Sequence, residues 1–87
     1  MEVHDIHHAD KIKTLLERYE EEIEDAEEYE ELAEEMPGCA KLFRTIGNEE
    51  VTHAYHLRDK LLKMGHEFAG EHESKWHKVL KTYGWEK

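Results

Sequence analysis

The chain has 87 residues, of which 38% are hydrophobic and 39% charged, and its formal net charge is −10. A domain of this size buries only about 60% of the surface that its unfolded chain exposes, so its own core is marginal and we expect a partner chain. The acidic balance excludes duplex DNA as a direct ligand and suits cations or a basic protein. A lone cysteine excludes a disulfide framework, and no secretory signal or run of eighteen apolar residues appears, so we expect a soluble, cytoplasmic protein without a membrane segment.

The first 36 residues predict a flexible arm followed by a long helix. Residues 1–9 show no clear periodicity and are assigned to the arm. From residue 10 to residue 36 an apolar stripe repeats every seven residues through two core-facing positions. One position holds Ile12, Tyr19, Ala26 and Ala33, and the other holds Leu15, Glu22, Tyr29 and Met36. Pro37 then ends the helix, because the residue before a proline is pushed out of the α region.

The rest of the chain predicts two further helices. A second helix over residues 39–64 must return antiparallel to the first, because only a short turn links them. Its main stripe holds Cys39, Phe43, Ile46, Glu50, His53, Leu57, Leu61 and Met64. A short third helix over residues 71–83 presents an apolar face that covers an end or flank of the hairpin, or else docks another protein. The fold class is therefore a single all-α domain, an antiparallel helical hairpin with a short C-terminal helix.

Three polar residues interrupt these stripes, namely Glu22 on the first helix and Glu50 and His53 on the second. Counted from Pro37 at 1.5 Å per residue, they lie about 22, 20 and 24 Å from the turn. All three are therefore expected at one level of the hairpin. A buried carboxylate without a partner costs several kcal/mol, so such a cluster needs a proton, a counter-charge or a metal ion.

The spacing of the three residues favours a metal ion. A glutamate from one helix with a Glu-x-x-His pair from the next is half the ligand set of a four-helix di-iron or di-manganese site. Two hairpins related by a two-fold axis would supply four carboxylates and two imidazoles. Iron and manganese suit this oxygen-rich set, and zinc also binds it but brings no redox chemistry. The alternative is a hairpin whose polar positions face water or a partner.

Two sequence motifs occur within residues 12–64. Glu22 precedes Tyr29 by seven residues in "EEIEDAEEYEELAEE", and "EVTHA" begins at Glu50. Together they resemble the ferritin-like superfamily, particularly the helix pairs of rubrerythrin and encapsulated ferritin, of which this chain would be a half-length, two-helix member. The resemblance implies that Glu22 and Glu50 are terminal or bridging metal ligands, that His53 is a terminal ligand, and that Tyr29 is a hydrogen-bonding or redox-active neighbour.

The same resemblance implies an activity and an assembly. The activity is oxidation of Fe(II) by dioxygen or peroxide, as in a ferroxidase-type oxidoreductase, at a di-iron site shared between two chains. The assembly is a homodimer, or a higher even-numbered oligomer, in which two hairpins complete a four-helix bundle. The sequence leaves open whether the metal is catalytic or structural.

The acidic block from Glu20 to Glu35 supports a second interpretation from a different functional class. Such blocks are usually solvated helix faces. This one could instead imitate the phosphate spacing of a nucleic acid, which would make the protein a small non-enzymatic inhibitor that binds a basic protein partner. In that case the acidic face would be essential and the three ligand candidates dispensable.

Overall fold

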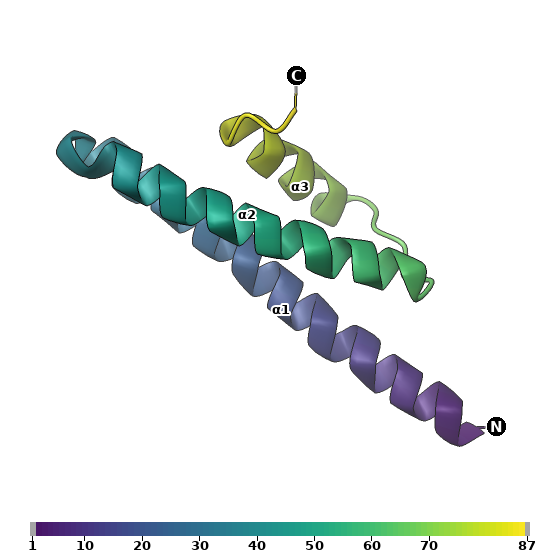
Figure 1. Ribbon diagram of the computed structural model, residues 1–87. Coiled ribbons are helices and arrows are strands. Elements are labelled where there is room, and N and C mark those ends of the chain that lie inside the picture. The colour runs from purple at the N-terminus through teal and green to yellow at the C-terminus, as the bar shows by residue number, and fades with distance from the viewer. Residues whose placement is uncertain (1, 87) are drawn as a thin grey trace.

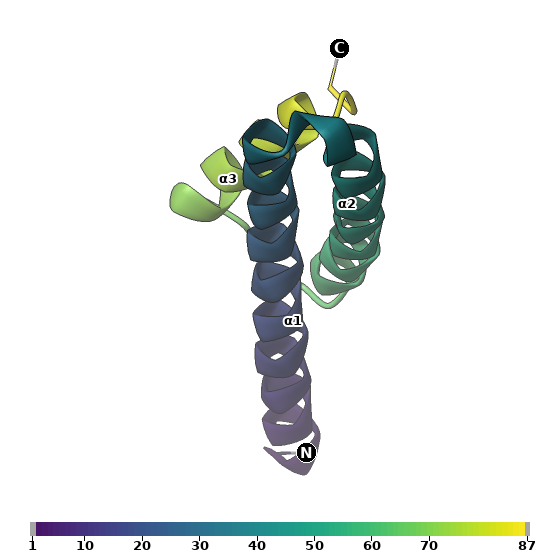
Figure 2. The same cartoon turned by 90° about the vertical axis from the view of Figure 1, so that its left-hand side faces the viewer.

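The computed structural model describes the backbone of residues 2–86 and the side chains of residues 8–86, and all regular structure in that part is helical. The elements are α1 (Glu2–Glu35), a 3-10 turn η1 (Pro37–Cys39), α2 (Ala40–Lys63) and α3 (Glu71–Thr82). α1 and α2 form an antiparallel hairpin, and α3 lies against one side of it (Figure 1 and Figure 2). The predicted all-α hairpin with a short third helix is thus confirmed. No helix in the described part combines the length and apolarity needed to cross a bilayer.

The N-terminal end differs from the sequence-based expectation, because α1 begins at Glu2 and includes the residues assigned to an irregular arm. No proline or glycine precedes Pro37, so nothing in the local sequence ends the helix before the turn. The ring of His8 also contacts the end of α2, with Nε2 2.9 Å from the carbonyl oxygen of Met64. Residue 1 and the side chains of residues 1–7 lie outside the described part of the chain.

The core lies between the two long helices and beneath α3. Its buried side chains are Tyr19, Ile23, Ala26, Ala33, Val51, Ala54, Leu61, Trp76 and Val79. On α2 the buried residues are Gly47, Val51, Ala54 and Leu61, and the missing side chain of Gly47 leaves room for the ring of Tyr83. Leu61 of the predicted stripe is fully buried, whereas the ring of His53 lies at the rim of the hairpin.

Arg58 of α2 holds α3 against the hairpin. Its guanidinium group forms an ion pair with Glu73 of α3 and donates a hydrogen bond of 3.2 Å to the Tyr19 hydroxyl. The same group lies 4.3 Å from the ring centre of Phe68 and 5.1 Å from that of Trp76, so it also makes cation–π contacts. α3 therefore covers a flank of the hairpin, one of the places expected for it.

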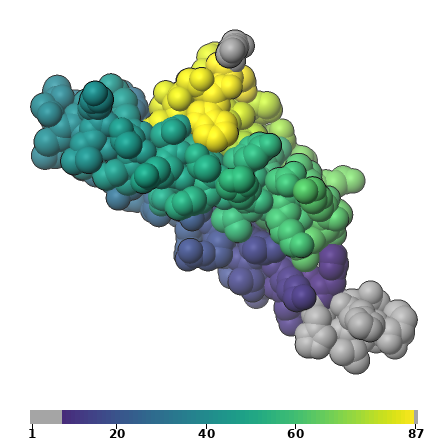
Figure 3. Space-filling view, in the orientation of Figure 1, coloured from purple at the N-terminus to yellow at the C-terminus, as the bar shows by residue number. Residues whose placement is uncertain are grey.

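The segment after α3 adds a second anchor at Tyr83. Its hydroxyl donates a hydrogen bond of 2.5 Å to the carbonyl oxygen of Ala26, and its ring lies directly against Gly47. Burial raises the pKa of Tyr83 to about 12, so the phenol remains a donor at neutral pH. Figure 3 shows this C-terminal segment, in yellow, seated on α2, in teal. Tyr83 therefore contacts both long helices, α1 at Ala26 and α2 at Gly47.

Candidate metal centre

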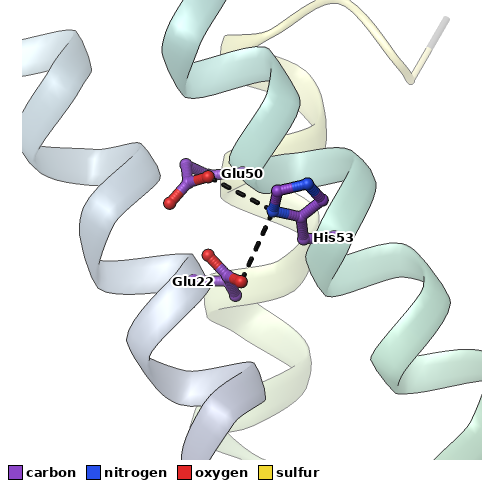
Figure 4. Close-up of side chains that lie close together, drawn as sticks. All are labelled: Glu22, Glu50 and His53. Carbon is purple, nitrogen blue, oxygen red and sulfur yellow. Dashed lines mark ion pairs between the residues drawn. The ribbon is translucent and has the colours of Figure 1, made fainter.

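Glu22, Glu50 and His53 meet at mid-height of the hairpin, the first from α1 and the other two from α2 (Figure 4). Nδ1 of His53 lies 3.5 Å from a carboxylate oxygen of Glu22 and 3.3 Å from one of Glu50. One ligand atom from each residue lies within 4.8 Å of the other two. The structure thus brings the three residues to one level, as counting along the helices predicts.

The two helices position these side chains in different ways. Glu50 and His53 are three residues apart, which places both on one face of α2. Glu22 faces them from α1, where it lies about one turn before the fully buried Ala26. The side chains of Glu22 and Glu50 are 12% and 19% exposed, whereas that of His53 is 57% exposed. The cluster therefore opens outward at its imidazole.

The cluster opens on the side of the hairpin that is turned away from α3. In Figure 4 the three side chains lie in front of the hairpin, and the pale yellow ribbon of α3 passes behind it. Residues spaced by seven or eleven along a helix share a face. We call this side the open face and define it by Leu15, Glu22 and Tyr29 on α1 and by Leu42, Glu50 and His53 on α2.

The two carboxyl groups interact strongly with each other. Burial raises the pKa of Glu50 to about 7, and the hydrogen bond to Glu22 and the negative charges of Glu22 and Asp25 act in the same direction. The charge of His53 lowers the pKa of Glu50. Two carboxylates held this close need a proton or a cation between them. A metal ion in this position would compete with the proton that the raised pKa favours on Glu50.

Tyr29 is not part of the cluster. It lies two turns from Glu22 toward the hairpin turn, about 10 Å along the axis. Its ring stacks on Phe43, with 6.2 Å between the ring centres. Among the described side chains no hydrogen bond joins Tyr29 to the three ligand candidates, and its role as a neighbour of the metal stays a prediction.

Two further residues, Asp25 and Tyr83, shape the cluster and were not predicted from the sequence. Asp25 adds negative charge next to Glu50 and lies three residues after Glu22, so the helical spacing alone would have found it. Tyr83 holds Ala26 and Gly47 from the far side, but it comes from a distant segment and no sequence signal pointed to this contact.

Comparisons with protein-family models, with curated proteins and with solved structures find no match for this chain. The resemblance to the ferritin-like superfamily accordingly stays a prediction. The donor atoms of Glu22, Glu50 and His53 and their surroundings make the cluster a candidate metal centre.

Proposed function

We propose that the protein binds iron through Glu22, Glu50 and His53 of each chain, as a di-iron carboxylate protein whose centre is shared between two chains. The observation that carries the proposal is the convergence of two carboxylates and one imidazole, with donor atoms within 4.8 Å of one another. This donor set fits Fe(II) or Mn(II), and zinc would bind to the same atoms. The raised pKa of Glu50 supports it, because a site built for a cation brings acidic groups together.

The exposure of the cluster supports a site that two chains complete. Three donors from one chain leave an octahedral metal ion short of ligands, and the exposed ring of His53 marks the side from which others can approach. A second copy related by a two-fold axis would bring the total to four carboxylates and two imidazoles. The pairing would also bury the open face, which adds to the marginal core of a single chain.

The residues of the chain and the metal would contribute differently to the chemistry. A bound iron pair would supply the oxidation of Fe(II) by dioxygen or peroxide. The chain's own residues bind and orient the ions, and Glu50 gives up its proton when a cation binds, so binding releases protons. Asp25 adds negative charge that attracts cations to the cluster.

The experiment that tests this function is an anaerobic titration of the metal-free protein with Fe(II), followed by desalting and metal analysis. We expect about one iron per chain in the native protein, and a loss of at least tenfold in affinity in Glu50→Ala and His53→Ala. Circular dichroism should show unchanged helicity in both variants. Glu49→Ala is the matched control, because Glu49 is an exposed neighbour outside the cluster.

Three results would contradict the proposal. Undiminished iron binding in Glu50→Ala would show that the cluster is not the site, and an equal loss in Glu49→Ala would show that binding reflects acidic charge in general. A native protein that retains no iron would favour the other interpretation, in which the acidic block from Glu20 to Glu35 binds a basic protein.

A further inference from the structure

Two histidines of α3 lie beside carboxylates, on different sides of the helix. Nε2 of His72 is 3.6 Å from a carboxylate oxygen of Glu20 on α1. His77 differs, because both of its ring nitrogens face carboxylates. Its Nδ1 lies 2.9 Å from an oxygen of Glu86 in the segment after α3, and its Nε2 lies 3.3 Å from an oxygen of Glu73 on α3 itself. His77 therefore bridges α3 and the C-terminal segment.

The two contacts of His77 require the charged form of its ring. A neutral imidazole has one N–H group and one bare nitrogen, whereas the imidazolium donates from both nitrogens. A bare nitrogen that faces a carboxylate oxygen is repelled, because both atoms carry lone pairs. The bridge is therefore complete only while His77 is protonated. Imidazole groups as a class change charge between about pH 5 and 8, so a bridge of this kind responds to pH near neutrality.

The two carboxylates of the bridge differ in their other partners. Glu73 also forms an ion pair with Arg58 of α2, so its charge stays compensated when His77 is neutral. Among the described side chains, Glu86 has no ion pair or hydrogen bond other than the one with His77. Deprotonation of His77 therefore costs Glu86 its one cationic partner, and Glu86 is the end of the bridge that is released.

The surroundings of His77 contain few other charged groups. On α3, Lys81 lies one turn beyond it. On α2 the charged group at the bridge is Arg58, which reaches it through Glu73. The acidic side chains of α1 line two grooves on the other side of α3. The α3 residues on that side include His72, Lys75 and Lys78. The charged groups in contact with the ring of His77 are therefore the two carboxylates.

The segment that Glu86 holds also contacts α2 (Figure 3). The indole N–H group of Trp85 donates a hydrogen bond of 2.6 Å to Oδ1 of Asn48. The ring of Trp85 also lies against that of Tyr55, with 6.0 Å between the ring centres. The two neighbouring residues Trp85 and Glu86 therefore fix the segment on two sides, one to α2 and the other to α3.

The turn that leads into this segment does not depend on His77. Gly84 has a φ of 77°, and the backbone N–H group of Trp85 donates to the carbonyl oxygen of Leu80, which closes the end of α3. α3 also keeps its two buried side chains in the core. Loss of the bridge would thus free the side chains of the last residues and leave α3 in place.

We infer that His77 is a pH-sensitive latch, whose protonated ring holds the C-terminal segment on α2 and whose deprotonation releases Glu86 and uncovers Asn48 and Tyr55. The latch is closed near about pH 6 and opens as the pH rises toward about 8. The side chains of His77 and Glu86 are 59% and 41% exposed, and a pair this exposed shifts an equilibrium by about fivefold or less. The latch therefore changes the populations of two states and does not lock one. It uses no residue of the ligand cluster, so it is independent of the proposed function.

The test follows the indole N–H signal of Trp85 by nuclear magnetic resonance between about pH 5.5 and 8. Trp85→Phe identifies the signal, because the chain has only one other tryptophan. In the native protein we expect the signal to move upfield as the pH rises, since the hydrogen bond to Asn48 is lost. Its midpoint should equal that of the ring signals of His77. In His77→Gln the signal should stay close to its position in the native protein at the upper end of this range.

Two other histidines serve as matched controls. His72→Gln removes a ring on α3 that faces a carboxylate with one nitrogen and lies away from the bridge. His56→Gln removes the other ring near the segment, because His56 packs edge-on against Tyr55. Both variants should keep the pH dependence of the native protein. The carboxyl group of Glu50, with its pKa of about 7, is present in all these variants, so it does not account for a difference between them.

Glu86→Gln separates the latch from the charge of His77 itself. The ring of His77 still titrates in this variant, but the signal of Trp85 should move by less than half of the native shift. Circular dichroism should show native helicity in every variant, because none of the substituted histidines is buried. A native Trp85 signal that does not change with pH would overturn the inference. An equal change in His77→Gln or an undiminished change in Glu86→Gln would overturn it as well.

Discussion

The carboxyl group of Glu50 makes the stability of the metal-free protein depend on pH. Its pKa is raised from 4.5 to about 7, so the folded state favours the protonated form. This contribution is fully present below about pH 4.5 and is lost as the pH rises through about 7. We predict that the melting temperature of the metal-free protein falls over this range and that Glu50→Gln, which is neutral throughout, flattens the fall. Calorimetry of both proteins would contradict this prediction if their slopes were equal.

Gly47 is the glycine at which an added methyl group should lower the stability of the fold most. A Cβ atom there would lie 2.6 Å from Cζ of Tyr83, so Gly47→Ala forces the phenol away from Ala26. We predict a destabilisation of about 1–3 kcal/mol, as for other overpacked positions. Tyr83→Leu in the same chain should recover part of this loss, and denaturant unfolding of the two single variants and the double variant measures the coupling. Strict additivity of the two effects would show that the two residues do not interact.

Among single residues, the sequence could predict the three ligand candidates but not their exposure. Glu22, Glu50 and His53 share a level because the helical rise is constant, and counting from Pro37 suffices. The rotation of α2 about its axis was not predictable in this way. The inward face of α2 carries Gly47, which lies against Tyr83, and the buried Ala54, and this leaves the ring of His53 at the rim.

At the scale of helices, two arginine–glutamate pairs allow a controlled comparison. Arg58 is largely buried between aromatic rings and pairs with Glu73 of α3, whereas Arg44 is exposed and pairs with Glu30 across the hairpin. We predict that Arg58→Ala costs about 2–3 kcal/mol and increases hydrogen exchange in α3. Arg44→Ala should cost less than about 1 kcal/mol, as exposed pairs do. Equal losses in urea unfolding would contradict the assigned role of Arg58 in holding α3.

Local sequence signals predict the hairpin, but not the start of α1 or the position of α3. The hairpin follows from two apolar stripes and a proline–glycine turn, which are local signals. The extension of α1 to Glu2 was missed because a helix is predicted from a repeating apolar stripe, and the sequence of residues 1–9 shows no such repeat. The position of α3 was not fixed either, because an arginine such as Arg58 is ordinarily expected at the surface.

At the scale of the whole molecule, one chain is an elongated body of 55 × 21 × 17 Å with α3 on one side only. A ligand bound only by the folded dimer stabilises it in proportion to the logarithm of its concentration. We therefore predict that adding zinc or anaerobic Fe(II) raises the melting temperature, and that the midpoint also rises with protein concentration. Differential scanning fluorimetry at several protein concentrations measures both effects. A metal-induced shift that is the same at every protein concentration would indicate a site complete within one chain.

In the proposed assembly, two chains share a metal centre built from Glu22, Glu50 and His53. Native mass spectrometry of protein loaded anaerobically with Fe(II) tests it most directly, because it reports the number of chains and of bound ions in the same particle. We predict dimers, or higher even-numbered assemblies, that carry two irons per pair of chains and lose them in His53→Ala. Monomers that carry iron, or dimers that carry none, would contradict it.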